Sequence, residues 1–184
     1  METKETAKQK WTDNDTEAMF ATIGKYLVVF QWMEGILDQI LLLGWGWENW
    51  GASQVKIAGM TNEKKIKAVR KLVMSAREFA RVHTRPDWLE HFQSVLKRFD
   101  EERQQRNTLV HSQYLFEAVD AGIPPLISKR TKSEGKATFD QRHFSKEFQT
   151  HLFENVGKLS MDLNFVLVQL RHDYAAHELS SAGE

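Results

Sequence analysis

One short run of this sequence combines the side chains needed for proton transfer and for binding an anionic phosphate group, Arg106-Asn107-Thr108-Leu109-Val110-His111. An imidazole such as that of His111 gives and takes protons near neutral pH. Arg106 stays charged and presents a planar fork of N–H donors to phosphate oxygens. Asn107 can orient His111 or donate to the phosphate. These three residues form the candidate catalytic group.

Arg106 stands where the helical pattern requires a core residue. A helix beginning near residue 87 places four apolar residues on one face: Leu89, Phe92, Leu96 and Phe99. The same spacing continues to Arg103 and Arg106. A buried guanidinium is costly unless it is paired, and Glu34 is the one charge on the buried stripe of the first long helix. We therefore predict a contact between Glu34 and Arg103 or Arg106.

The positions of Arg106 and His111 raise a geometric question. On an ideal helix the two residues lie about 140° apart, whereas Asn107 and His111 share a face. Either the helix loosens before His111, or two copies of the chain combine their motifs. Val28 and Trp32 lie off the main apolar stripe of the first helix and predict a second buried face, which fits a dimer.

Hydrophobic periodicity predicts an all-α fold, an up-down four-helix bundle with a small hairpin-like insertion between helices 3 and 4. The helices are expected at about residues 16–43, 61–82, from 87 and from 145. Thr61 is a plausible N-cap for the second helix. Residues 44–51 are interpreted as a folded loop that covers a core edge. Two short runs at 126–131 and 137–141 predict the hairpin.

The domain organisation predicted from length is a single helical domain over residues 1–184, with flexible tails at about 1–15 and 175–184. The absence of cysteine excludes disulfides, thiolate metal sites and thiol catalysis. No glutamate stands three residues before any histidine, which argues against a carboxylate-bridged di-iron bundle. Phosphate-binding loops are also missing. We expect no metal and no cofactor.

Charge and hydropathy limit the kinds of partner that the protein can bind. The chain has 25 Lys and Arg against 25 Asp and Glu, so its formal net charge of zero argues against a broadly basic surface. Locally, residues 62–81 and 121–150 carry net charges of +5 and +3, which favours a basic rim along a cleft. The polar N-terminus lacks the apolar core of a signal peptide. We expect a cytoplasmic protein without membrane contact.

The run RNTLVH resembles the motif of the HEPN superfamily, small all-helical proteins that include metal-independent ribonucleases. That motif is an Arg, four to six residues and a His, with Asn common directly after the Arg. Other arginines of this chain precede a histidine at a suitable spacing, but only Arg106 is followed by Asn. The order of elements is similar too, because a long first helix precedes the motif and a long helix follows it.

The resemblance implies a metal-independent endoribonuclease that works by 2′-hydroxyl attack and yields a 2′,3′-cyclic phosphate and a 5′-hydroxyl. Arg106, His111 and Asn107 would be catalytic, with Glu34 and Arg103 in support, and Tyr114 could line the same cleft. It also implies a homodimer with paired motifs, RNA as substrate, a toxin-like or phage-defence role and an antitoxin protein as partner.

Two other interpretations remain open at this point. A non-catalytic HEPN-like helical dimer would bind nucleotide or a protein partner and keep the motif as an ion-pair network. A purely structural helical dimer would have no chemistry in the cleft. In either case His111 would only cap helix carbonyls.

Overall fold

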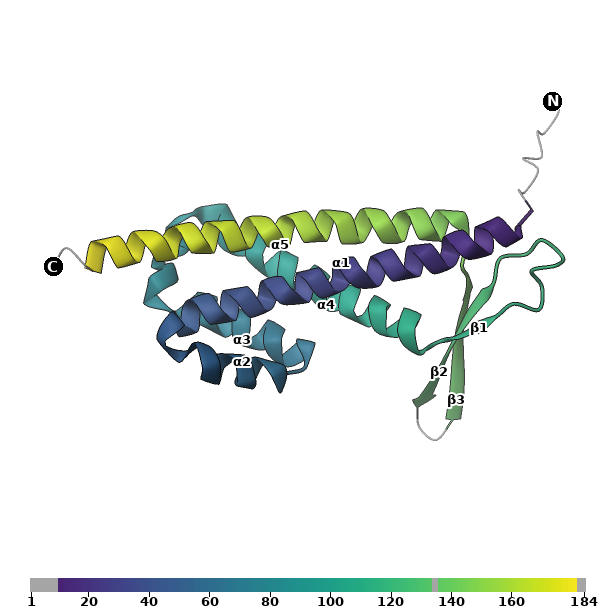
Figure 1. Cartoon of the computed structure of the whole chain (residues 1–184), viewed down its shortest axis with the longest axis horizontal. Coiled ribbons are helices and arrows are strands. Elements are labelled where there is room, and N and C mark those ends of the chain that lie inside the picture. The colour runs from purple at the N-terminus through teal and green to yellow at the C-terminus, as the bar shows by residue number, and fades with distance from the viewer. Residues whose placement is uncertain (1–9, 134–135, 182–184) are drawn as a thin grey trace, which may run out of the picture. The chain divides into compact units, whose positions relative to one another are not determined.

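The computed structural model describes residues 10–133 and 136–181. Within these ranges the chain is mostly helical, and a small antiparallel sheet lies between α4 and α5 in the sequence (Figure 1). The elements are α1 (Asp13–Trp45), η1 (Trp47–Asn49), α2 (Trp50–Ala58), α3 (Asn62–Ser75), η2 (Arg77–Thr84), α4 (Pro86–His111), β1 (Gln113–Leu115), β2 (Leu126–Ser133), β3 (Lys136–His143) and α5 (Lys146–Ser181). The predicted helical character, with an insertion before the last helix, is confirmed.

The chain divides into two compact units, which are described one at a time. The first unit contains the chain up to Tyr26 and Asn107–Phe153, so it holds the start of α1, the last turns of α4, the sheet and the start of α5. The second unit contains Leu27–Arg106 and the chain from Glu154.

The core of the second unit is built from apolar side chains of α1, α4 and α5. Phe30 of α1 and Phe99 of α4 stack with ring centroids 5.3 Å apart, and both are buried. Phe92 of α4 and Leu163 of α5 are fully buried as well. Removing one large core side chain of this kind typically costs about 3–5 kcal/mol, so this cluster is a main source of the unit's stability.

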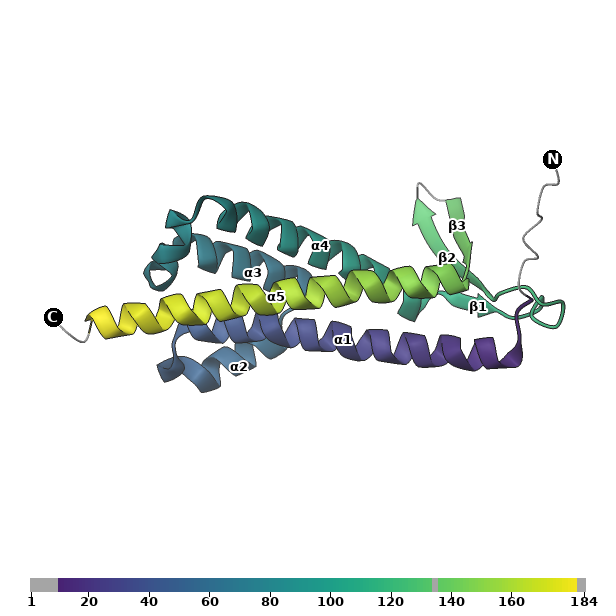
Figure 2. The ribbon, with the colours of Figure 1, turned by 90° about the horizontal axis from the view of Figure 1, so that it is seen from above.

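In the first unit the beginnings of α1 and α5 lie side by side and run in the same direction (Figure 2). Lys146 pairs with Asp15 at 2.7 Å, and further along both helices Thr22 donates to Gln149 at 3.0 Å. The hydrogen bond from Lys146 lowers the pKa of Asp15 below its usual value.

The parallel course of these segments corrects the predicted topology, because a strict up-down bundle makes its first and last helices antiparallel. The physical reason is the inserted sheet. It belongs to the same unit as the start of α1, so the chain enters α5 at the end where α1 begins.

The sheet has the order β1-β2-β3 with antiparallel pairs throughout. The predicted hairpin is present and longer than expected, since its pairing runs from Leu126↔His143 to Ser133↔Lys136. The short strand β1 was not predicted. Three residues carry too little periodicity to indicate a strand, and β1 exists only because β2 lies beside it.

Two predictions for the second unit need correction. Residues 44–51 are not a loop: α1 continues to Trp45, Gly46 turns the chain at a positive φ of 79°, and η1 and α2 follow. The helix expected over 61–82 is divided into α3, which ends at Ser75, and the 3-10 helix η2. The N-cap of α3 is confirmed, because the Thr61 hydroxyl accepts a hydrogen bond from the Lys64 amide.

The described parts of the expected tails are ordered. The Trp11 amide donates to the Gly122 carbonyl at 2.8 Å and its buried indole donates to Thr16, just inside α1. At the other end α5 remains helical to Ser181. Residues 1–9 and 182–184, also expected to be flexible, lie outside the described residues.

By length and composition, α1 is the one helix in the described ranges that could cross a membrane. Of its most apolar window, 44% is buried inside the protein. A core helix passes the same test, so this feature by itself is weak support for a membrane span.

Candidate functional site

In the second unit Arg106 is held by a carboxylate and an aromatic ring. Its Nη2 lies 3.2 Å from Oε1 of Glu34, and its guanidinium lies 5.2 Å from the centroid of the Phe30 ring. The Arg106 side chain is 27% exposed and the Glu34 side chain 19%. Asn62 also donates a hydrogen bond to Glu34 Oε1. The predicted contact between Glu34 and an arginine is therefore confirmed for Arg106.

Three helices of the second unit build this arrangement. Phe30 and Glu34 stand four residues apart on α1, so they share a face and together contact the guanidinium. Asn62 is the first residue of α3, directly after the Thr61 N-cap, and this position brings its amide to the carboxylate. The charged pair is thus oriented by side chains that are themselves fixed by helix geometry.

Arg103 does not take part in this contact. Its Nε lies 2.8 Å from Oδ1 of Asp100, one turn earlier on the same helix. Of the two arginines considered as partners of Glu34, Arg103 is not the one used, because Asp100 three residues away is reached without crossing to another helix.

The other motif residues belong to the first unit. Asn107 is half-buried, and His111 is the exposed last residue of α4. Within the described part of the chain the His111 ring makes no hydrogen bond, so of the two roles considered for Asn107, orienting His111 is not observed and binding the phosphate stays a prediction. The helix does not loosen before His111 either, since α4 stays α-helical to that residue.

A lysine that sequence analysis did not select reaches the motif in the first unit. The Lys129 ammonium on β2 donates to the Thr108 hydroxyl at 3.0 Å. Thr108 and His111 stand three residues apart, and Asn107 and His111 four, so all three lie on one face of α4. Lys129 therefore adds a cation to the helix face that carries His111. The only sequence signal was the net positive charge of residues 121–150.

Tyr114 has a structural contact. Its hydroxyl donates to the Leu109 carbonyl at 2.7 Å, close to the end of α4, and its ring packs against Phe144. Burial raises the pKa of the Tyr114 phenol above its usual value, so the phenol stays protonated and able to donate at neutral pH. The phenol is thus engaged with an otherwise unpaired helix-end carbonyl rather than directed at a substrate.

We expect Tyr114→Phe to lower the free energy of unfolding by about 1 kcal/mol, because it removes one part-buried hydrogen bond and little packing. Denaturant unfolding followed by circular dichroism measures this change. A variant as stable as the wild type would show that the hydrogen bond contributes nothing.

Within the described residues no cluster of three or more His, Cys, Asp or Glu side chains could hold a metal ion. Comparisons of the chain with protein-family models, with curated proteins and with solved structures found no match. The protein is therefore characterised by its own features, a mostly helical fold with an inserted sheet and a half-buried Glu34–Arg106 pair.

Proposed function

We propose that this protein is a metal-independent endoribonuclease of the HEPN type. The observation that carries the proposal is the half-buried Arg106, which pairs with Glu34 at 3.2 Å and is followed by Asn107 and His111 on the same helix. A charge held in place before substrate arrives stabilises an anionic transition state without reorganisation during the reaction. The remaining exposed part of Arg106 gives a phosphate access to the guanidinium.

In this mechanism His111 takes the proton of a ribose 2′-hydroxyl, and the oxygen attacks the neighbouring phosphorus. The bond from phosphorus to the 5′-oxygen breaks, and this oxygen takes up a proton. The products are a 2′,3′-cyclic phosphate and a 5′-hydroxyl. Asn107 and Lys129 donate hydrogen bonds to the phosphate, and Arg106 stabilises the negative charge that builds up on it.

We further propose that the working form is a homodimer. In each chain α1, α3, α4 and α5 would supply the four helices of the HEPN arrangement. Because α4 is continuous, Arg106 and His111 of one chain lie about 140° apart, so each would act with a residue of the partner. Large exposed side chains of the second unit supply an apolar surface for the interface: Val28, Trp32, Met161, Phe165 and Val168.

The biological setting remains a proposal from resemblance. A toxin-like or phage-defence ribonuclease in the cytoplasm, without membrane contact, would need an antitoxin protein that covers the site until it is required.

The test is incubation of the purified protein with mixed RNA in EDTA. We expect cleavage with 2′,3′-cyclic phosphate ends, and a rate at least about 100-fold lower for His111→Ala, since general acid–base catalysis contributes on that scale. His151→Ala is the matched control, because His151 is an exposed histidine on α5. Cleavage that requires added Mg²⁺, or full activity of His111→Ala, would refute the mechanism.

One observation favours the non-catalytic alternative, in which the dimer binds nucleotide or a protein partner. Among the described residues none hydrogen-bonds the His111 ring, whereas a catalytic histidine is usually held by a second group. In that case the wild type leaves RNA intact, and Arg106→Ala changes only the melting temperature.

A further inference from the structure

The β2–β3 hairpin presents two cations and an aromatic ring on one face. Arg130 pairs across the strands with Phe139, and Lys132 pairs with Ala137. Cross-strand partners and residues two apart on one strand point to the same side of a sheet. Arg130, Lys132 and Phe139 therefore share a face, and the hairpin carries them away from the helical segments of the first unit (Figure 1).

These three side chains are open to solvent. Phe139 is 59% exposed, and Arg130 and Lys132 are exposed as well. Across residues 10–133 and 136–181 neither cation has an ion-pair partner. The opposite face differs, because Thr131 and Thr138 hydrogen-bond each other at 2.7 Å and Lys129 is bound to Thr108. The face with Phe139 therefore combines an exposed aromatic ring with two cations that have no ion-pair partner among the described residues.

The charge of the hairpin indicates the kind of molecule. Residues 126–143 contain five Lys and Arg against two acids, a net charge of +3 on a chain whose total is zero. An anionic partner is attracted to such a segment. A planar partner would in addition cover the exposed ring of Phe139, since every nucleobase has a face that stacks on an aromatic side chain.

We propose that this face of the hairpin, Arg130, Lys132 and Phe139, binds single-stranded RNA. One base stacks on Phe139, and the flanking phosphates pair with Arg130 and Lys132, which stand about 7 Å apart along β2. A duplex is unsuitable, because its bases are stacked on each other and cannot reach the ring. This inference rests on the proposed ribonuclease function, and in it the hairpin binds the RNA that the ribonuclease site cleaves.

Binding is measured by fluorescence anisotropy with a labelled, unstructured 2′-O-methyl RNA of about 12 nucleotides, a length in the range of known single-strand sites. The methyl group blocks the attacking oxygen, so binding is separated from cleavage. We expect Phe139→Ala to weaken binding at least about fivefold, the lower end for loss of one base stack. Phe139→Trp should retain the affinity, which a role in packing alone would not require.

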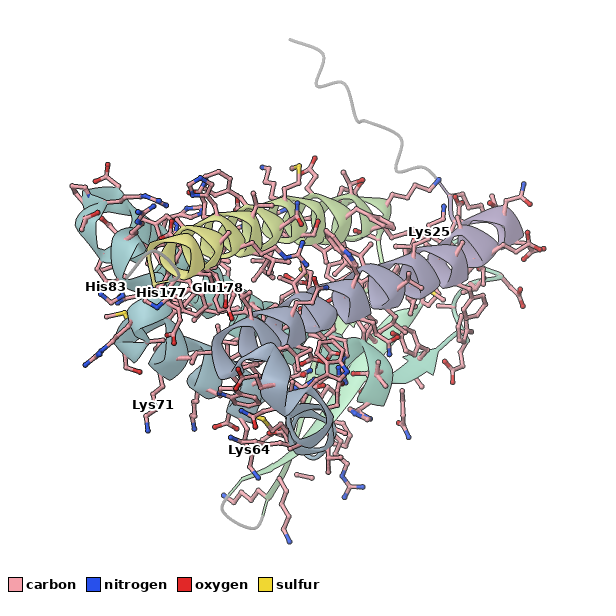
Figure 3. The ribbon with its side chains drawn as sticks, turned by 60° about the vertical axis from the view of Figure 1, so that its left-hand side comes forward. Lys25, Lys64, Lys71, His83, His177 and Glu178 are labelled. Atoms are coloured by element: carbon pink, nitrogen blue, oxygen red, sulfur yellow. The ribbon has the colours of Figure 1, made fainter. Side chains whose placement is uncertain are left out.

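The charges are tested with Arg130→Gln/Lys132→Gln. For single strands the slope of log K against log salt is about −0.7 per phosphate neutralised, so losing two contacts should make the slope less negative by about 1.4. The matched control is Lys25→Gln/Lys158→Gln. Both lysines are exposed (Lys25 is labelled in Figure 3), and removing them takes away the same charge outside the two segments of the expected basic rim. Circular dichroism checks that all variants are folded.

Three results would overturn the proposal: wild-type binding by the hairpin variants, an equal loss in the Lys25→Gln/Lys158→Gln control, or equally tight binding of duplex RNA. Absence of wild-type binding, or Phe139-dependent binding of a protein in its place, would do the same. The ribonuclease function is scored separately on unmodified RNA. If RNA binding depends on the hairpin but no cleavage depends on His111, only the ribonuclease function is rejected. If cleavage is unchanged in the hairpin variants, only RNA binding by the hairpin is rejected.

Discussion

Arg106→Ala is expected to reduce the rate of RNA cleavage by about 100- to 1000-fold, the usual effect of removing one preorganised donor from an anionic transition state. The loss should appear in kcat more than in KM, because the charge that Arg106 stabilises grows during the reaction. Single-turnover cleavage of a labelled RNA in EDTA measures it.

Arg106→Lys tests whether geometry matters in addition to charge. Lysine keeps the positive charge but loses the planar fork, so we expect it to recover only a small part of the rate. Arg103→Ala is the matched control on the same helix, since the ion pair of Arg103 is with Asp100, whereas that of Arg106 is with Glu34. Its cleavage rate should equal that of the wild type.

Glu34→Gln tests whether the charge of Glu34 positions Arg106 for the reaction. The amide still accepts a hydrogen bond from Arg106 but no longer fixes it by charge, so we expect a smaller loss of kcat than for Arg106→Ala. If Arg106→Ala cleaves RNA normally and melts like the wild type, Arg106 has no catalytic role.

The largest stability effect is expected at Arg85, where Arg85→Ala should lower the free energy of unfolding by about 3–5 kcal/mol. Asp173 of α5 is fully buried, and its Oδ1 lies 2.7 Å from Nη2 of Arg85. Arg85 also donates to Gln169 at 2.7 Å. Removing the guanidinium leaves a buried carboxylate without its charged partner, and this cost is a large fraction of a typical total stability of 5–15 kcal/mol.

A second ion pair of the same unit provides the control. Asp162 of α5 pairs with Arg98 of α4 at 2.5 Å, but both side chains are about one-third exposed. Arg98→Ala should therefore cost less than about 1 kcal/mol. Urea unfolding of both variants gives the comparison.

The physical cause is tested by removing the charge that Arg85 compensates. In the Arg85→Ala background, Asp173→Asn should recover part of the lost stability, because an uncharged amide is cheaper to bury than an unpaired carboxylate. Equal destabilisation by Arg85→Ala and Arg98→Ala, or no recovery by Asp173→Asn, would show that burial of this charge is not the cause.

Local patterns in the sequence were enough for the main elements. The three- and four-residue spacing of apolar side chains predicted α1, α4 and α5, and the two short runs at 126–131 and 137–141 predicted β2 and β3. The same spacing predicted that Glu34 contacts an arginine, because a charge on a buried stripe needs a partner of opposite charge.

Other features depended on interactions that have no local signal. As partners for Glu34, Arg103 and Arg106 looked equivalent in the sequence, yet Arg103 pairs within α4 and Arg106 pairs with Glu34 of α1. The division of the region from 61 to 84 into α3 and η2, and the helix α2 in a glycine- and tryptophan-rich segment, depended on packing that overrides local propensity.

The sequence by itself determined the helical character of this protein, the hairpin and the RNTLVH motif, because periodicity and residue type act over a few neighbouring positions. Only the tertiary structure decided that Lys129 reaches Thr108 across 21 residues of chain and that the start of α5 runs parallel to the start of α1. Both contacts join segments far apart in sequence, and the folding of the inserted sheet determines which of them meet.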